Sequence, residues 1–429
     1  KSSVNKIMKI KDIKAYEILD SRGNPTVAAK VILSDGITGM SLVPSGASTG
    51  KHEAVEKRDN NNDRFLGQGV TSAVNNIHNH ILPILRDKDA SDLFSNDLLM
   101  LEADGTDSKE NLGANAILSV SMACAKAASI SLKISLHDYI ANKASELYGR
   151  EIKQKLPVPM LNILNGGAHA DNTIDFQEFM IRPFKFNTFS DSLRCGVEIF
   201  HTLKKTLEKK NLNTSVGDEG GFAPNLSTPE SALDLIMESI EKAGYKPGEE
   251  VNLCLDVAAT EFYSNSFYKM QGYSNLNSNE MIDCLKTLKN SYPIYSIEDG
   301  LDEDDWLGWK NLTKELGSKT QLVGDDLFVT NTKRIEKGIE ESSANAVLIK
   351  VNQIGTLSET LQAIKLADEN NLNNVISHRS GETEDTFIAD LSVGTGAGQI
   401  KTGAPSRSDR VAKYNRLLLI EKNSDICFG

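Results

Sequence analysis

The chain has 429 residues, more than one ordinary domain holds, so we expect two domains. Its 39% apolar and 25% charged residues are typical of a globular enzyme and argue against a largely disordered chain. The net charge of -12 disfavours direct nucleic-acid binding, because an acidic surface repels polyanions. The five cysteines are widely spaced without a CxxC pair, which argues against zinc or redox chemistry and favours a reducing cytoplasm.

The first 50 residues alternate apolar and polar side chains in three runs, IKDIKAYEI, TVAAKVIL and ITGMSLVP. This period of two predicts a three-stranded antiparallel meander, and the spacing from about Lys51 to Ala144 then becomes helical. We therefore expect a tail over residues 1–7 and an α+β domain over residues 8–147. The opening KSSVNKIMKIKD has no apolar core, so no signal peptide is predicted.

The least polar stretch begins at Leu112 and reads LGANAILSVSMACAKAASISL. Asn115, Lys126 and several serines interrupt it before it reaches the length of a membrane span. We predict a buried helix of the α+β domain and no membrane span.

Residues 148–429 change to short apolar runs separated by amphipathic helical segments, after LPVPMLNIL, whose prolines we interpret as a linker. Each run ends in a polar group, and these groups follow one another at 23 to 42 residues, which suits one strand plus one helix. The pattern predicts a closed parallel β/α barrel, whose strand ends meet at one mouth where barrel enzymes keep their active sites. The end groups are Asp256, Glu298, Asp325, Lys350, His378 and Lys401.

Three successive strand ends carry carboxylates, Asp256, Glu298 and Asp325. Hard oxygen ligands favour magnesium, calcium or manganese, and magnesium best fits a site with few protein ligands and open positions for substrate. The alternative is that each acid caps the following helix. Because three converging acids would repel one another without a cation, a metal site is the better interpretation.

Lys350 ends the next strand, after the apolar run AVLI. A desolvated lysine close to metal cations should favour its neutral amine, which would make it a general base. The alternative is that it only forms ion pairs with the nearby acids.

Two glycine-rich segments do not fit nucleotide-binding motifs. PSGASTGKHE has three residues between Gly46 and Gly50 instead of four, and GTGAGQIKTG has Gln399 where a dinucleotide motif has its third glycine. We interpret the first as a mobile loop over the site, with the Ser48 hydroxyl able to reach a metal. Lys51 in the same loop adds positive charge near an anionic substrate.

Further segments carry polar groups suited to chemistry. The histidine of NGGAHADN follows two glycines, and a structural role is the alternative for it. GDEGG places an acid on a tight turn, and SHRSGETED joins an arginine to hydroxyls, which suits a phosphate. These segments, with FQEFMI, contribute His169, Gln177, Glu178, Glu219, His378, Arg379 and Ser380.

Taken together, nine strings closely resemble the enolase family, especially its bacterial members, over nearly the whole chain. They are SGASTG, GGAHADN, QEFMI, GDEGGFAP, IEDG, GDDLFVTN, KVNQIGT, SHRSGETED and KTGAPSRSDRVAKYN. The resemblance implies reversible, magnesium-dependent dehydration of 2-phospho-D-glycerate to phosphoenolpyruvate in glycolysis and gluconeogenesis. Enolase-superfamily sites are already known to pair a Lys or His base with one or two Mg²⁺ ions, so this pairing is a general property of the superfamily.

The resemblance also implies a role for each site residue. Lys350 would remove the proton beside the substrate carboxylate, and Glu219 would protonate the departing hydroxyl. Two Mg²⁺ ions would bind per active site, the tighter one on Asp256, Glu298 and Asp325, and Ser48 would help to chelate the second. The residues expected to bind substrate are His169, Gln177, Glu178, Glu298, Asp325, His378, Arg379, Ser380 and Lys401, with the phosphate on Arg379 and Ser380 and the carboxylate on Lys401.

Two rival functions are compatible with parts of this pattern. Another lyase of the superfamily, acting on acid sugars or cycloisomerising a diene acid, would share the three acids but is not expected to carry GDEGG with SHRSGETED. A non-catalytic role, as a surface receptor or an RNA-processing scaffold, would not conflict with catalysis. The family further implies a cytoplasmic homodimer, assembled into an octamer in some members, with a secondary cell-surface or secreted pool in some.

Overall fold

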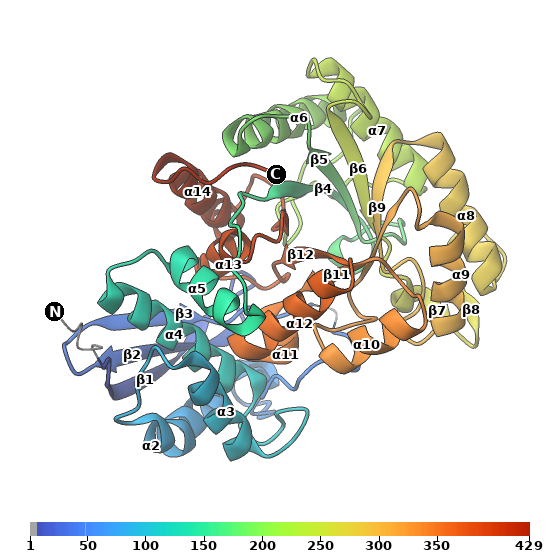
Figure 1. Cartoon of the computed structure of the whole chain (residues 1–429). Coiled ribbons are helices and arrows are strands. Elements are labelled where there is room, and N and C mark those ends of the chain that lie inside the picture. Colours follow the sequence, from blue (N-terminus) through green and yellow to red (C-terminus); the bar gives the residue numbers. More distant parts are fainter. Residues whose placement is uncertain (1–6, 48) are drawn as a thin grey trace.

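The computed structural model describes residues 7–47 and 49–429, and its first part contains the predicted meander (Figure 1). Strands β1 (Ile10–Leu19), β2 (Pro25–Leu33) and β3 (Thr38–Leu42) form an antiparallel sheet in the order β1-β2-β3. Helices cover this sheet, so the expected α+β unit is confirmed. They are α1 (Thr71–Asn76), α2 (Leu82–Leu85), α3 (Leu93–Asp104), α4 (Ala114–Leu132) and α5 (Leu136–Tyr148), with a π-turn η2 (Ile77–Ile81) between α1 and α2.

The helical region begins later than the sequence spacing suggested. Between residues 51 and 70 the chain is irregular except for one short turn, η1 (Phe65–Gly67), and the first helix begins at Thr71. This segment is held by polar contacts instead of helix packing: the Asp59 carboxylate accepts hydrogen bonds from the backbone and hydroxyl groups of Thr71 and Ser72. The expectation of helix from about Lys51 was therefore wrong for these residues.

Helix α4 is the buried helix that the sequence predicted. By length and composition alone it could cross a membrane, but 83% of its most apolar window is buried inside the protein, as in a core helix. Strand β3 packs closely on it at Gly39, where an added Cβ atom would overlap backbone atoms of Ala127 and Ala123. A residue without a side chain is required at this contact.

The second part is a closed eight-stranded barrel in the order β10-β11-β12-β13-β4-β5-β6-β9. Its strands are β4 (Val158–Asn165), β5 (Glu178–Pro183), β6 (Val251–Asp256), β9 (Ile294–Glu298), β10 (Gln321–Gly324), β11 (Ala346–Ile349), β12 (Asn373–Ser377) and β13 (Gln399–Lys401). All six predicted apolar runs are strands, which confirms the barrel. The segment interpreted as a linker is wrong in part, because its residues from Val158 onward form β4.

We expected a wholly parallel barrel, but one of its strands runs in the opposite direction. Strand β5 runs antiparallel to both neighbours, β4 and β6. The connection from β4 to β5, residues 166–177, contains only the short turn η3 (Gly167–His169). A parallel strand would need a crossover helix to carry the chain back to the other end of the barrel, and this connection has none. As a result, the first residue of β5, Glu178, lies at the same mouth as the last residues of the other strands.

Helices surround the barrel (Figure 1). They are α6 (Phe189–Lys209), α7 (Pro229–Lys242), α8 (Ser278–Ser291), α9 (Trp306–Leu316), α10 (Thr332–Glu340), α11 (Val351–Ile354), α12 (Leu357–Glu369), α13 (Phe387–Thr395) and α14 (Ser408–Lys422). A short turn η4 (Ala259–Phe262) and a small hairpin of β7 (Tyr263–Ser264) and β8 (Phe267–Tyr268) lie between β6 and α8.

The two parts pack together beside the barrel mouth. Figure 1 shows α3 and α4 next to α11 and α12. The Asp97 carboxylate of α3 accepts hydrogen bonds from the Ser358 backbone (2.9 Å) and hydroxyl (2.5 Å) at the start of α12. Closer to the mouth, Ser45 and Gly381 exchange two backbone hydrogen bonds of 2.7 Å. This bridge holds the loop after β3 over the strand ends.

Candidate active site

The predicted end groups converge at one mouth of the barrel. Each is the last residue of its strand or the residue directly after it. Strands β6, β9 and β10 are neighbours in the barrel, so the three predicted carboxylates occupy adjacent strand ends. One cavity is lined by His169, Gln177, Glu178, Glu219, Asp256, Asp325, Lys350, Ser377, His378, Arg379, Ser380 and Lys401. Every predicted site residue lines it except Glu298, which contacts Lys401, and Ser48, which is outside the described residues.

The three acids do not cap the helices that follow them. Within the described chain, helices α8, α9 and α10 are capped by the side chains of Asn277, Asp305 and Asn331, each accepting a hydrogen bond from a backbone N–H. The helix-capping alternative for the strand-end carboxylates is therefore wrong.

Lys401 lies within a group of buried carboxylates. Its Nζ is 2.5 Å from Glu298 Oε2, 2.5 Å from Glu178 Oε2 and 3.3 Å from Asp256 Oδ2. Burial alone would lower the pKa of Lys401, but these acids raise it well above its usual range. Burial and the charge of Asp256 in turn raise the pKa of Glu298 well above its usual range.

This donor set fits a divalent cation. Glu178, Asp256 and Glu298 each offer a carboxylate oxygen, and these atoms lie within 4.8 Å of one another. Glu298 Oε1 is buried and has no hydrogen-bond partner among the described residues, so it is available as a ligand. Carboxylate oxygens without sulfur or nitrogen are the ligands that magnesium prefers.

Asp325 belongs to a second acidic group, with Asp299 and Asp326. The three predicted ligands thus lie on adjacent strands but are divided between two clusters, each with its own lysine. The Asp299 carboxylate accepts the backbone N–H groups of Asp325 (2.8 Å) and Asp326 (2.9 Å), which fixes the turn after β10. Gln353 Nε2 donates to Asp325 Oδ1 at 2.8 Å and Lys350 Nζ donates to Asp325 Oδ2 at 2.7 Å, so both oxygens of this carboxylate are held.

Lys350 pairs with Asp325 at 2.7 Å. Its burial alone would lower the pKa, but the charge of Asp325 raises it above its usual value. The expectation of a lowered pKa is therefore not met by the protein groups alone, and the ion-pair alternative describes the contact. The groups that raise the pKa are Asp325 and Glu298, whereas burial, Arg379 and Lys401 all lower it.

A third group joins two carboxyls and a histidine on the far side of the mouth. His169 Nδ1 lies 3.5 Å from Glu178 Oε1 and 3.6 Å from Glu219 Oε2. Asn162 Nδ2 donates to Glu219 Oε2 at 2.9 Å and to Glu178 Oε1 at 3.3 Å. His169 is thus surrounded by other site groups, which speaks against the purely structural alternative.

The two carboxyl groups of this corner differ in acidity. Burial and the negative charge of Glu219 raise the pKa of Glu178 to about 8. Burial would also raise the pKa of Glu219, but the neighbouring His169 and His378 hold it well below its usual value. Burial lowers the pKa of His378 to about 4. Of the two carboxyl groups, Glu178 is therefore the weaker acid.

Arg379 and Ser380 face the mouth from the loop after β12. Arg379 forms a bidentate ion pair with Glu53, from Nη1 to Oε2 at 3.0 Å and from Nη2 to Oε1 at 3.1 Å. Its Nη1 also donates to Asn352 Oδ1 at 3.1 Å. Ser380 Oγ lies 3.0 Å from His169 Nε2, which links the anion-binding side to the acid corner.

The loop that carries Glu53 is fastened to the barrel. The Lys51 ammonium pairs with Asp304, and His52 Nε2 lies 3.0 Å from Asp304 Oδ1. Lys51 thus pairs with a carboxylate of the loop before α9, and its charge is directed there and not toward the mouth.

Sequence reasoning missed Glu53, Asn162, Asp299 and Gln353. All four stand next to residues that it singled out or within the strings GKHEAVE, LNIL, IEDG and KVNQIGT. Their side-chain types alone gave no signal, because their roles depend on partners far along the chain. Glu53 and Arg379, for example, are 326 residues apart.

Comparison with known families covers both parts of the chain. Residues 10–140 match the family model described as the enolase N-terminal domain. Residues 153–425 match the one described as the enolase C-terminal TIM barrel domain.

Proposed function

This chain belongs to the enolase family, and from that premise we propose that it catalyses the magnesium-dependent, reversible dehydration of 2-phospho-D-glycerate to phosphoenolpyruvate. The proposed setting is glycolysis and gluconeogenesis. The proposal makes the chain a carbon–oxygen lyase of the enolase superfamily.

The observation that carries the proposal is that Lys350 and the Glu178–Glu219 pair lie on opposite walls of one mouth. Lys350 follows β11 and Glu178 begins β5, and these strands are four positions apart in a ring of eight. A substrate between them would present a C–H bond to one wall and a hydroxyl group to the other. Removal of a proton and loss of a hydroxyl from adjacent carbons needs this arrangement.

Lys350 is the proposed base. It must be neutral to accept the proton beside the substrate carboxylate, and the groups that oppose this are Asp325 and Glu298, both proposed metal ligands. Neutralising those two carboxylates leaves burial, Arg379 and Lys401, which all lower the pKa of Lys350. The pairing with Asp325 then serves to hold Nζ in place.

Asp256, Glu298 and Asp325 are the proposed ligands of the tighter of two Mg²⁺ ions, and Ser48 would contribute to the second. Bound magnesium would stabilise the negative charge that builds up on the substrate carboxylate after proton removal. Lys401, held among the same carboxylates, would add a fixed positive charge beside that carboxylate. Gln353 and Asp299 would position Asp325 for this purpose.

Glu219 is the proposed acid, working as a pair with Glu178. The electrons of the broken C–H bond form the C=C bond, and the C–O bond breaks as the hydroxyl takes a proton and leaves as water. Glu178 is the weaker acid of the pair, so Glu219 would receive a proton from Glu178 and pass it on. His169 and Asn162, which contact both carboxyls, keep the two groups together.

Arg379 and Ser380 are the proposed phosphate-binding groups, and His378, which lies beside Glu219, is a further proposed substrate-binding residue. The Arg379 guanidinium is already oriented by Glu53 and Asn352. An arginine fork with a neighbouring hydroxyl suits the oxygens of a phosphate group. Gln177, which donates to Asp256 Oδ2 at 3.2 Å, completes the proposed substrate-binding set.

The division of labour between the two walls can be tested with two variants. Lys350→Ala should lose exchange of the α-proton of 2-phosphoglycerate with solvent deuterium, measured by NMR. Glu219→Gln should retain this exchange but lose formation of the enol product. The exposed Lys204→Ala variant should keep both activities. Equal loss of both activities in both site variants would count against the assignment, and absence of exchange in the unmodified protein would favour another superfamily lyase.

We further propose that the protein works as a cytoplasmic homodimer and that residues 8–147 and 148–429 are its two domains. Size-exclusion chromatography with light scattering measures the first property. A monomeric mass at assay concentration would contradict it.

A further inference from the structure

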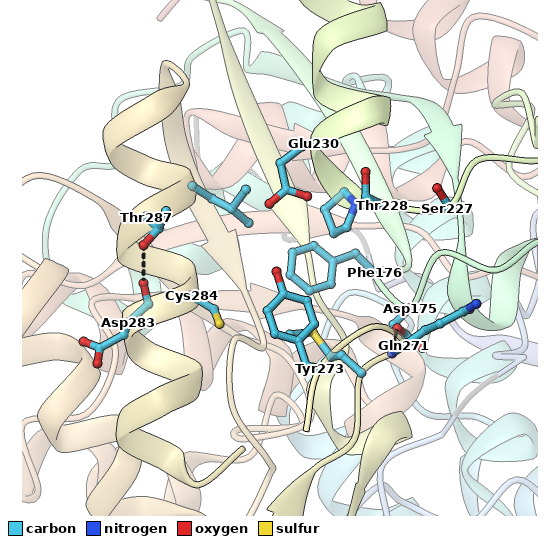
Figure 2. A pocket seen from close by; sticks show the side chains of 13 residues that line it. Asp175, Phe176, Ser227, Thr228, Glu230, Gln271, Tyr273, Asp283, Cys284 and Thr287 are labelled. Atoms are coloured by element: carbon cyan, nitrogen blue, oxygen red, sulfur yellow. Dashed lines mark hydrogen bonds between the residues drawn. The ribbon is translucent and has the colours of Figure 1, made fainter. Parts of the chain in front are cut away.

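A second cavity, of about 260 Å³, lies between the start of α7, the loop after β8 and helix α8 (Figure 2). One wall is formed by Asp175 and Phe176, which directly precede the active-site residue Gln177. The backbone N–H of Gln271 donates to Asp175 Oδ2 at 2.8 Å and ties the loop after β8 to this wall. None of the proposed catalytic residues lines this cavity.

The interior of the cavity is apolar. Its walls include Phe176, Met270 and Leu288, all of them buried, and the ring of the half-exposed Tyr273. Figure 2 shows Phe176, Tyr273 and Cys284 gathered around the space. An apolar cavity of about 150 Å³ holds a benzene ring, so this one has room for a ring with a short arm.

The charged groups of the cavity are acidic. Asp175 and Glu230 contribute carboxylates, whereas the carboxylate of the exposed Asp283 is directed away from the space (Figure 2), and the lining includes no lysine, arginine or histidine. Within the described chain, none of the three carboxylates has an ion-pair partner. Burial and then the charge of Glu230 raise the pKa of Tyr273, as expected where the local potential is negative.

Two other kinds of occupant fit less well. Burial and the charges of Asp283 and Glu230 raise the pKa of Cys284, so its thiol stays protonated near neutral pH and is a weak nucleophile. This argues against an electrophile that bonds to the thiol. An anion at the start of α7 would be repelled by Glu230 in the first turn. The backbone N–H of Ser231 is not free to bind it, because it already donates to the Thr228 side chain.

We propose that this cavity binds a small organic cation with an apolar body, of the arylalkylamine class. The ring would pack against Phe176, Met270 and Leu288. The ammonium group would lie toward Glu230, with the Tyr273 ring able to contribute a cation–π contact. This site is independent of the proposed dehydration, although it shares the wall that leads to Gln177.

The test is calorimetric titration of the full chain, with magnesium and inorganic phosphate present to occupy the catalytic mouth. The probes are phenethylamine, which is protonated at neutral pH, and 2-phenylethanol, a neutral molecule of nearly the same shape. One partly solvated carboxylate should favour the amine by about three- to fivefold. No measurable binding of the amine, or equal affinity for the two probes, would overturn the proposal.

The location is tested with Glu230→Gln, which removes the charge and keeps the size of the side chain. The preference for the amine should fall below about twofold. The matched control, Glu241→Gln, removes one exposed charge outside the cavity and should keep the preference. Survival of the preference in the first variant would place the amine elsewhere and overturn the proposal.

Discussion

Asp97 couples the stability of the protein to pH at the contact between its two parts. Its side chain is buried and accepts two hydrogen bonds from Ser358. Burial raises the pKa of Asp97 from 3.8 to about 6. Because the folded protein binds this proton more tightly than the unfolded chain, the group contributes most stability below pH 3.8, and this contribution is lost as the pH rises through about 6.

The size of the effect follows from the two pKa values. At about 1.4 kcal/mol per pKa unit, the full contribution of Asp97 to the free energy of unfolding is about 3 kcal/mol. About 2.5 kcal/mol of this contribution is lost between about pH 4 and about pH 7.5. Asp97→Asn keeps the shape without the charge. The free energy of unfolding of the variant relative to the parent should therefore rise by about 2.5 kcal/mol over this range.

The measurement is urea denaturation of both proteins across the pH range, followed by circular dichroism and tryptophan fluorescence in parallel. Coincident transitions justify a single free energy of unfolding. Asp92→Asn, at an exposed position beside the same helix, is the control and should give a flat difference. A flat difference for Asp97→Asn as well would refute the reasoning.

Three further substitutions test the packing and orientation of the site. Gln353→Ala removes the hydrogen-bond donor to Asp325 and should reduce magnesium affinity or turnover by about 10- to 100-fold. Titration of the activity with magnesium measures this effect, and an unchanged magnesium dependence would contradict the prediction. Glu53→Gln leaves the buried Arg379 guanidinium without its carboxylate and should lower the free energy of unfolding by about 3 kcal/mol; the exposed Glu110→Gln variant should change it little. Gly39→Ala forces β3 away from α4 and should lower the melting temperature without changing KM; unchanged melting would argue against the close contact.

The barrel was predictable where the sequence alternates regularly between strand and helix. Six strands and their end groups were identified because each apolar run is short and ends in a polar residue. Strand β4 was missed because Pro157 and Pro159 suggested a linker, although Pro159 pairs with Ile400 inside the barrel. A proline is tolerated there although it cannot donate a backbone hydrogen bond.

The direction of β5 could not be read from its residues. An antiparallel strand and a parallel strand can show the same buried apolar run, and only the lack of a helix between β4 and β5 gives a hint. The consequence is large, because this reversal brings Glu178 to the mouth. Without it, Lys401 would lose one of its closest carboxylate contacts, at 2.5 Å.

The candidate site was predictable in its members but not in its contacts. The residues of the mouth follow from strand ends and from the motif strings, whereas their pairing follows from side-chain positions. The sequence suggested one cluster of Asp256, Glu298 and Asp325, and the structure divides these acids between Lys401 and Lys350. Without a bound cation the pKa of Lys350 is raised for the same reason, because its nearest charged neighbour is the Asp325 carboxylate.

The central claim is that this chain dehydrates 2-phosphoglycerate with magnesium. The most direct measurement follows the ultraviolet absorbance of the enol product after 2-phosphoglycerate is added to the purified protein with magnesium, then with excess chelator, then with magnesium restored. We predict that absorbance rises, stops rising and rises again in these three stages. No product with magnesium, or product formation that continues unchanged in excess chelator, would contradict the claim.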